Sequence, residues 1–211
     1  MKALSSKICV ICGQQLATTN DHLPPKGIFP KPRPSDLISV RTCLSCNKST
    51  SDIEEIFKVY IGFLCGHGVE GEKLFKSQTL KTLDHNRRLK RDLAGSLHDI
   101  WIQATDGVSE RKAAVRFNTK PFDCIAEQTV RGIYFRQTGE ILANRVDFKI
   151  IWPNKLTTEA YAISKKWPSG IVGGGQFSYR FLIHRENPLA SIWILEFFNK
   201  TLACCLVLPN K

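Results

Sequence analysis

No long apolar run occurs in this sequence. The longest hydrophobic stretches, around residues 192–198 and 202–208, have the length of a strand, whereas a helix that crosses a bilayer needs roughly 20 apolar residues. An apolar segment of the kind that defines a secretory signal is also missing, because Met1 and Lys2 lead directly towards the first cysteine pair. We therefore expect a chain that associates with no membrane and works in the cytoplasm.

Acidic side chains are scarce relative to basic ones. The chain holds 19 Asp and Glu against 30 Lys and Arg, which gives a formal net charge of +11. Such a surface favours polyanions, since each phosphate that a cation neutralises releases condensed counterions. This excess indicates a nucleic-acid partner. The densest basic cluster falls within 70–93, a segment that we expect to form one helix, and comprises Lys73, Lys76, Lys81, Arg87, Arg88, Lys90 and Arg91.

Large apolar groups are few in the first 50 residues, which are rich in Pro, Ser, Thr, Lys and Cys instead. A polar segment this short needs an additional stabilising element, such as a bound metal, that offsets the entropy lost when the segment becomes ordered. Two Cys-x-x-Cys pairs, Cys9 with Cys12 and Cys43 with Cys46, have the spacing of a tetrahedral zinc site. Structural zinc contributes on the order of 10 kcal/mol to the folding of such modules. The other cysteines lie in apolar surroundings and are expected in the core: Cys65, Cys124, Cys204 and Cys205.

The rest of the chain has patterns of both helix and strand. Ser51 and Glu54 have the spacing of a capping box, and the apolar residues of 53–64 recur at intervals of three and four, as in an amphipathic helix. The pattern predicts further helices over 122–138, ended by Gly139, and over 156–167. It predicts strands over 146–152, 176–184, 191–198 and 202–208, with a tight turn at Asn199 and Lys200. The class is therefore α+β, with a small antiparallel C-terminal sheet packed against helices.

Asp21 and His22 lie between the two cysteine pairs, in the segment Asp-His-Leu-Pro-Pro-Lys, and Asn47 follows directly after the second pair. This set of residues resembles the HNH endonuclease superfamily, whose members share the ββα-metal fold. More narrowly, it is similar to the cysteine-bearing branch that includes phage endonuclease VII and many bacterial proteins with an Asp-His-x-Pro-Pro-Lys box. The resemblance covers residues 8–60, about a quarter of the chain.

The resemblance implies a role for each matched residue. Asp21 and Asn47 would hold a catalytic divalent ion, Mg²⁺ or Mn²⁺, and His22 would be the general base that activates water. Asp36 stands where many members carry an Asn that orients the base histidine; an Asp can accept a hydrogen bond from the imidazole but donates none. The implied organisation is a zinc-bound HNH nuclease module in residues 1–66, followed by a helical and antiparallel-sheet region of unknown role in 67–211.

Phosphodiester hydrolysis requires these residue types independently of the family resemblance. A hard cation held by a carboxylate and an amide oxygen keeps positions open for phosphate and water, and a histidine that titrates near neutrality takes the proton from water. Lys26 is a candidate for steadying a phosphate oxygen. The end of the basic helix is a candidate for tracking the backbone, through Arg87, Arg88, Lys90 and Arg91. We therefore expect a DNA endonuclease, with RNA as an alternative substrate.

Two other functions fit the same residues. One is a zinc-stabilised nucleic-acid-binding module without catalysis, and the other is a degenerate nuclease fold that serves as a scaffold for protein interactions. Proteins with the Asp-His-x-Pro-Pro-Lys box occur in bacterial and phage settings, including antiviral defence. By resemblance, this is compatible with a partner protein such as an ATPase, or with an oligomer.

Overall fold

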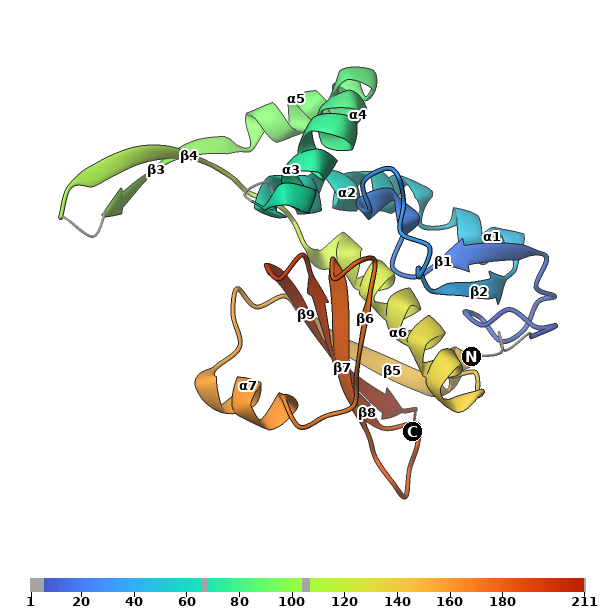
Figure 1. Ribbon diagram of the computed structural model, residues 1–211. Helices are drawn as coiled ribbons and strands as arrows, with labels where there is room; N and C mark the ends of the chain where they lie inside the picture. The colour runs from blue at the N-terminus through green and yellow to red at the C-terminus, as the bar shows by residue number, and fades with distance from the viewer. Residues whose placement is uncertain (1–5, 66–67, 104–106, 211) are drawn as a thin grey trace.

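The computed structural model describes residues 6–65, 68–103 and 107–210 and has the α+β class that the sequence predicts (Figure 1). A two-stranded antiparallel sheet and several helices form the N-terminal part, and a five-stranded antiparallel sheet forms the C-terminal part. No helix within these ranges is long and apolar enough to cross a bilayer.

The N-terminal part is a strand pair followed by two helices. Strand β1 (Thr19–His22) pairs with β2 (Ser39–Thr42), with Asp21 opposite Val40 and His22 opposite Ser39. The connection between them contains the 3₁₀ turn η1 (Lys26–Ile28), and β2 is followed by α1 (Leu44–Lys48) and α2 (Ser51–Cys65). Asp21 and His22 therefore lie at the C-terminal end of β1, where the chain leaves the sheet.

Helix α2 begins at the predicted residue, but its first turn is held differently. The Thr50 hydroxyl donates to Glu54 Oε1 at 2.8 Å, and Thr50 is buried. The predicted capping box between Ser51 and Glu54 is therefore wrong, because the carboxylate reaches one residue further back to a buried hydroxyl.

The apolar stripe of α2 is buried as predicted. The Phe57 ring packs edge-on against the rings of Phe122, Trp152 and Phe197, with centroid distances of 5.1, 5.9 and 5.3 Å. One cluster of buried residues runs from Cys9 and Cys43 near the N-terminus to Val207 in the last strand. The two predicted parts therefore share a core, and the boundary predicted between residues 66 and 67 falls on residues outside the described ranges.

The long helix predicted over 70–93 is interrupted. The chain forms α3 (Val69–Leu74), a π-helical turn η2 (Phe75–Thr79), α4 (Leu80–His85) and then α5 (Arg87–Gly95). Asn86 separates α4 from α5: its φ and ψ are −95° and 82°, and its Oδ1 accepts the backbone N–H of Leu89 at 2.9 Å. An Asn side chain that bonds its own backbone competes with helix continuation, so the prediction of one helix is wrong at this residue.

An exposed β-hairpin follows α5 and was missed by the sequence patterns. Strands β3 (Leu97–Gln103) and β4 (Ser109–Val115) pair with each other alone, and none of their residues is buried. Figure 1 shows this hairpin projecting away from the rest of the molecule. Alternation of apolar and polar residues marks a strand only when one face is buried, and neither face of this hairpin is.

The C-terminal sheet has the strand order β5-β9-β8-β7-β6, and all neighbours are antiparallel. Its strands are β5 (Val146–Ile151), β6 (Ser169–Val172), β7 (Phe177–Ile183), β8 (Ser191–Phe197) and β9 (Thr201–Pro209). The four predicted strands are confirmed, whereas the short edge strand β6 was not predicted. The tight turn before β9 lies one residue earlier than predicted, since Phe198 and Asn199 are the residues with positive φ.

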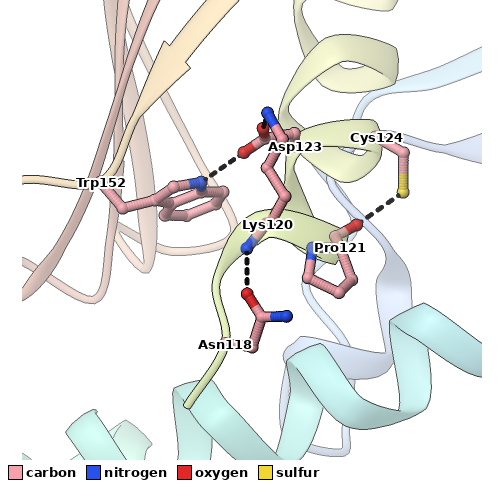
Figure 2. Close-up of polar contacts among 6 residues, drawn as sticks. All are labelled: Asn118, Lys120, Pro121, Asp123, Cys124 and Trp152. Carbon is pink, nitrogen blue, oxygen red and sulfur yellow. Dashed lines mark hydrogen bonds and ion pairs between the residues drawn. The ribbon is translucent and has the colours of Figure 1, made fainter.

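Helix α6 (Asp123–Thr138) packs against β5 and β9 and ends at Gly139, which has a φ of 79°, as predicted. A 3₁₀ turn, η3 (Lys120–Phe122), leads into it, η4 (Ala143–Arg145) follows it, and α7 (Thr158–Ser164) is shorter than the predicted 156–167. Figure 2 shows how the start of α6 is held: the Trp152 indole N–H donates to Asp123 Oδ1 at 2.9 Å, and the Cys124 thiol donates to the Pro121 carbonyl at 3.0 Å.

Candidate active site

Four cysteines from two turns meet at one point. Cys9 and Cys12 lie in a turn closed by the Cys9 N–H, which donates to the Gln15 carbonyl at 2.8 Å. Cys43 caps the N-terminus of α1 and Cys46 lies within that helix. The four Sγ atoms lie within 4.8 Å of one another, which fits ligands around one ion at Zn–S distances of about 2.3 Å. The predicted cysteine cluster is therefore confirmed, and it is able to hold a metal ion such as Zn²⁺.

The surroundings of Cys43 favour its thiolate form. Burial raises the pKa of this thiol, but hydrogen bonds with the Ser45 hydroxyl and the Cys46 backbone N–H outweigh that effect and lower the pKa to about 6. Cysteine ligands bind metal as thiolates, so this environment suits a metal ligand. Of the cysteines expected in the core, Cys65 and Cys205 are buried, whereas Cys124 and Cys204 are only half-buried.

The Asp21 carboxylate has one satisfied and one unsatisfied oxygen. Its Oδ1 accepts the backbone N–H of His22 at 2.8 Å, whereas its Oδ2 is buried and has no hydrogen-bond partner among the residues that the structure describes. Burial, reinforced by the nearby Glu54 carboxylate, raises the pKa of Asp21 to about 6. A buried carboxylate oxygen without a donor is destabilising, and a bound cation is one partner that would satisfy it.

The His22 imidazole has a lowered pKa. Burial has the largest effect, and the positive charges of Lys26 and Arg33 lower the pKa further. Within the described ranges, neither ring nitrogen takes part in a hydrogen bond. The ring is therefore neutral at pH 7 and has a nitrogen lone pair available to accept a proton.

Asn47 binds α1 to the strand that carries Asp21. Its amide Nδ2 donates to the Thr19 hydroxyl and to the Asn20 carbonyl, both at 3.1 Å. The amide oxygen is not used in these bonds, so it keeps its lone pairs for another partner. The structure therefore brings Asn47 beside β1 next to the Asp21-His22 pair, although the two lie far apart in the sequence.

Asp36 makes its hydrogen bond elsewhere. Its Oδ1 accepts the backbone N–H of Gly173, in the turn between β6 and β7, at 3.0 Å. In the part of the chain that the structure describes, no hydrogen bond joins Asp36 to His22. Its role in orienting His22 stays a prediction, and the observed contact ties the loop before β2 to the C-terminal sheet.

The predicted substrate-binding cations lie in two places. Lys26 is exposed, and its charge lowers the pKa values of both Asp21 and His22, so it belongs to the neighbourhood of the site. The α5 cations Arg87, Arg88, Lys90 and Arg91 are all exposed, on a helix without buried residues. This helix is anchored to α2, because the Asn86 amide donates to Glu55 Oε1 at 2.9 Å.

Sequence reasoning missed Glu54 as a neighbour of Asp21. This carboxylate is half-buried, burial raises its pKa, and its charge raises the pKa of Asp21. The sequence assigned Glu54 to a helix cap, and nothing in its local context distinguishes it from an ordinary acidic residue of a first turn. Its position becomes evident only when α2 packs against η1, in the loop that follows β1.

No family model, no curated protein and no solved structure matches this chain.

Proposed function

We propose that this protein is a metal-dependent endonuclease of the HNH type that hydrolyses phosphodiester bonds in DNA. In this proposal β1, β2 and α1 form a ββα-metal module, and Cys9, Cys12, Cys43 and Cys46 hold its structural Zn²⁺. The observation that carries the proposal is the pairing of Asp21 with His22. Among the residues that the structure describes, the buried Asp21 Oδ2 has no hydrogen-bond donor, and the imidazole of the next residue, His22, forms no hydrogen bond and has a lowered pKa.

The ligands of the catalytic ion would be oxygen atoms of Asp21 and Asn47. Carboxylate and amide oxygens suit the hard cations Mg²⁺ and Mn²⁺. When bound, the ion supplies charge neutralisation on the scissile phosphate. The two hydrogen bonds from the Asn47 amide to β1 orient its side chain, so the free amide oxygen has a defined position.

His22 acts as the general base. Its pKa lies below the ordinary histidine value, so the neutral form dominates at pH 7 and accepts a proton from the attacking water. General-base catalysis of this kind contributes about 10²- to 10⁴-fold to the rate. Lys26 is exposed, and its charge lowers the pKa values of both Asp21 and His22, so its ammonium group is placed to bind a phosphate oxygen.

The decisive experiment incubates supercoiled plasmid with the protein and Mg²⁺ or Mn²⁺, with EDTA as the metal-free control. Wild type is expected to give nicked or linear product. His22→Ala is expected to give none while its zinc content equals that of wild type. His184→Ala is a matched control, because His184 lies beyond β7 in the C-terminal sheet region, and it is expected to cut like wild type.

The other outcomes assign the other functions. Equal cutting by wild type and His22→Ala would refute His22 as the base. Tight DNA binding without cutting under any metal would identify a zinc-dependent binding module. Absence of both would leave the scaffold for protein interactions.

A further inference from the structure

A cleft lined by four cations lies on the N-terminal part of the molecule. It encloses about 420 Å³, and its charged lining consists of Lys31, Arg33, Lys58 and Lys81. Polar side chains of Ser77, Gln78 and Thr82 complete the lining, and no carboxylate of a described residue takes part in it.

Three segments that are far apart in the sequence build this cleft, and a hydrogen bond joins two of them. The Gln78 amide donates to the Phe29 carbonyl at 2.9 Å, which fastens the π-helical turn η2 to the loop after β1. The Arg33 Nε donates to the Lys26 carbonyl at 3.0 Å, which folds that loop back on itself. The third wall is α2, whose Lys58 side chain passes close to Gly27. The fold therefore brings the segments that carry the four cations to one cleft.

Among the described residues, none of the four cations forms an ion pair. Burial lowers the pKa of Lys58, and the charge of the Glu55 carboxylate, which also accepts the Asn86 amide at 2.9 Å, opposes that effect. Four cations around one cavity repel each other, and an anion bound in the cavity would offset this repulsion.

The cleft adjoins the candidate active site. Arg33, one of its four cations, donates to the Lys26 carbonyl at 3.0 Å, and Lys26 begins η1 in the connection that leaves β1 at His22. A chain of phosphates that occupies the cleft would therefore lie against the loop that follows His22.

We propose that this cleft binds the sugar–phosphate backbone of the nucleic-acid substrate, next to the phosphate that is cut. That the bound nucleic acid is also the substrate rests on the proposed function, whereas binding of nucleic acid in the cleft does not. Arg33, Lys58 and Lys81 contact successive phosphate oxygens, and this contact carries no base specificity. A basic cavity of this volume that holds several unpaired cations is suited to a polyanion rather than to a single monoanion.

The test measures binding of a labelled 20-base-pair duplex by fluorescence anisotropy, in a His22→Ala background so that no cutting interferes. The Arg33→Ala, Lys58→Ala, Lys81→Ala triple variant is compared with a Lys149→Ala, Lys155→Ala, Lys166→Ala triple variant. The control removes the same charge from exposed positions of the C-terminal region. The cleft variant is expected to bind roughly 10- to 100-fold more weakly at 0.15 M salt. The magnitude of the negative slope of log K against log salt concentration is expected to decrease by about 2 to 3. The control variant should change the affinity and this slope far less.

The melting temperature distinguishes a variant that has lost its contacts with DNA from one that has lost its fold. The substitutions relieve repulsion between like charges but remove the hydrogen bond from Arg33 to the Lys26 carbonyl, so the cleft variant is expected to melt close to its parent. A second variant with Gln at the three positions keeps the side-chain volume and is expected to lose the same affinity. Equal affinity and equal salt slopes for the cleft and control variants would overturn the proposal. Displacement of the duplex by inorganic phosphate at constant ionic strength would assign the cleft to small anions, and would overturn it as well.

The result is independent of the plasmid assay. If the cleft variants lose affinity while wild type cuts nothing, the cleft stands and the nuclease proposal fails. If wild type cuts and the cleft variants keep their affinity, only the cleft proposal fails.

Discussion

Replacing Asn47 separates the two roles that its amide group is proposed to play. The NH₂ group donates two hydrogen bonds to β1, to the Thr19 hydroxyl and the Asn20 carbonyl. The oxygen is the proposed ligand of the catalytic ion. Asn47→Ala removes both roles, whereas Asn47→Asp removes the donors but keeps oxygen atoms for the ion.

The structure sets the expected loss of stability. A hydrogen bond of this kind contributes about 0.5 to 1.5 kcal/mol net, so two such bonds give about 1 to 3 kcal/mol for Asn47→Ala. In a chain of this length, each kcal/mol lowers the melting temperature by about 2 to 4 °C. Asn47→Asp is expected to lose at least as much without divalent ions, since its carboxylate would face the Asn20 carbonyl that the amide now contacts.

Divalent ions then distinguish the two variants. Mg²⁺ neutralises the new carboxylate of Asn47→Asp, so this variant is expected to regain stability and part of its cutting activity. Asn47→Ala has no side-chain oxygen that could bind the ion, so this variant is expected to regain neither stability nor cutting activity. Stability is measured by urea unfolding with and without Mg²⁺, and activity by plasmid nicking. Asn154→Ala is the matched control, because Asn154 is exposed and its side chain forms no hydrogen bond with any residue that the structure describes.

The refuting results are specific. If Asn47→Ala is as stable as Asn154→Ala, the two hydrogen bonds do not position α1. If Mg²⁺ stabilises Asn47→Ala as much as Asn47→Asp, then Asn47 is not a ligand of the ion.

Four further predictions concern the site and its surroundings. The acid limb of the pH–rate profile is expected below the ordinary histidine value of about 6.5, because the pKa of His22 is lowered and the base must be neutral. The Mg²⁺ concentration needed for half-maximal rate should rise as the pH falls through about 6, because protons then compete with the ion for the Asp21 carboxylate. Single-turnover nicking between pH 5 and 8 measures the acid limb and the Mg²⁺ requirement. An acid limb above pH 7 would contradict the assignment of His22 as the base. Cys43→Ser is expected to lose the bound zinc and the folded N-terminal module, by metal analysis and limited proteolysis, whereas Cys124→Ser, whose hydroxyl can still donate to the Pro121 carbonyl, should lose neither. Alanine at Arg87, Arg88, Lys90 and Arg91 together is expected to weaken DNA binding and flatten its salt dependence without unfolding the protein, because α5 buries no residue; unchanged binding at low salt would refute a role for this helix.

The elements that the sequence predicted well are those with a buried face. Helices α2 and α6 and the strands β5, β7, β8 and β9 each place apolar residues against the shared core, so their periodicity is visible in the sequence. The elements that it missed lack this signal. The hairpin of β3 and β4 buries nothing, and the break at Asn86 depends on one side chain that bonds both Leu89 and Glu55.

The sequence alone identified the four cysteines that are able to hold a metal ion and the residues of the proposed chemistry, because Cys-x-x-Cys pairs and an Asp-His dipeptide are recognisable from their short spacing. Tertiary structure decided everything that depends on distant segments. It placed Asn47 against β1, Glu54 beside Asp21 and Asp36 on Gly173, and it gathered Arg33, Lys58 and Lys81 around one cleft. No local pattern encodes these contacts, since they arise only when α2 and η2 pack against the loop that leaves β1.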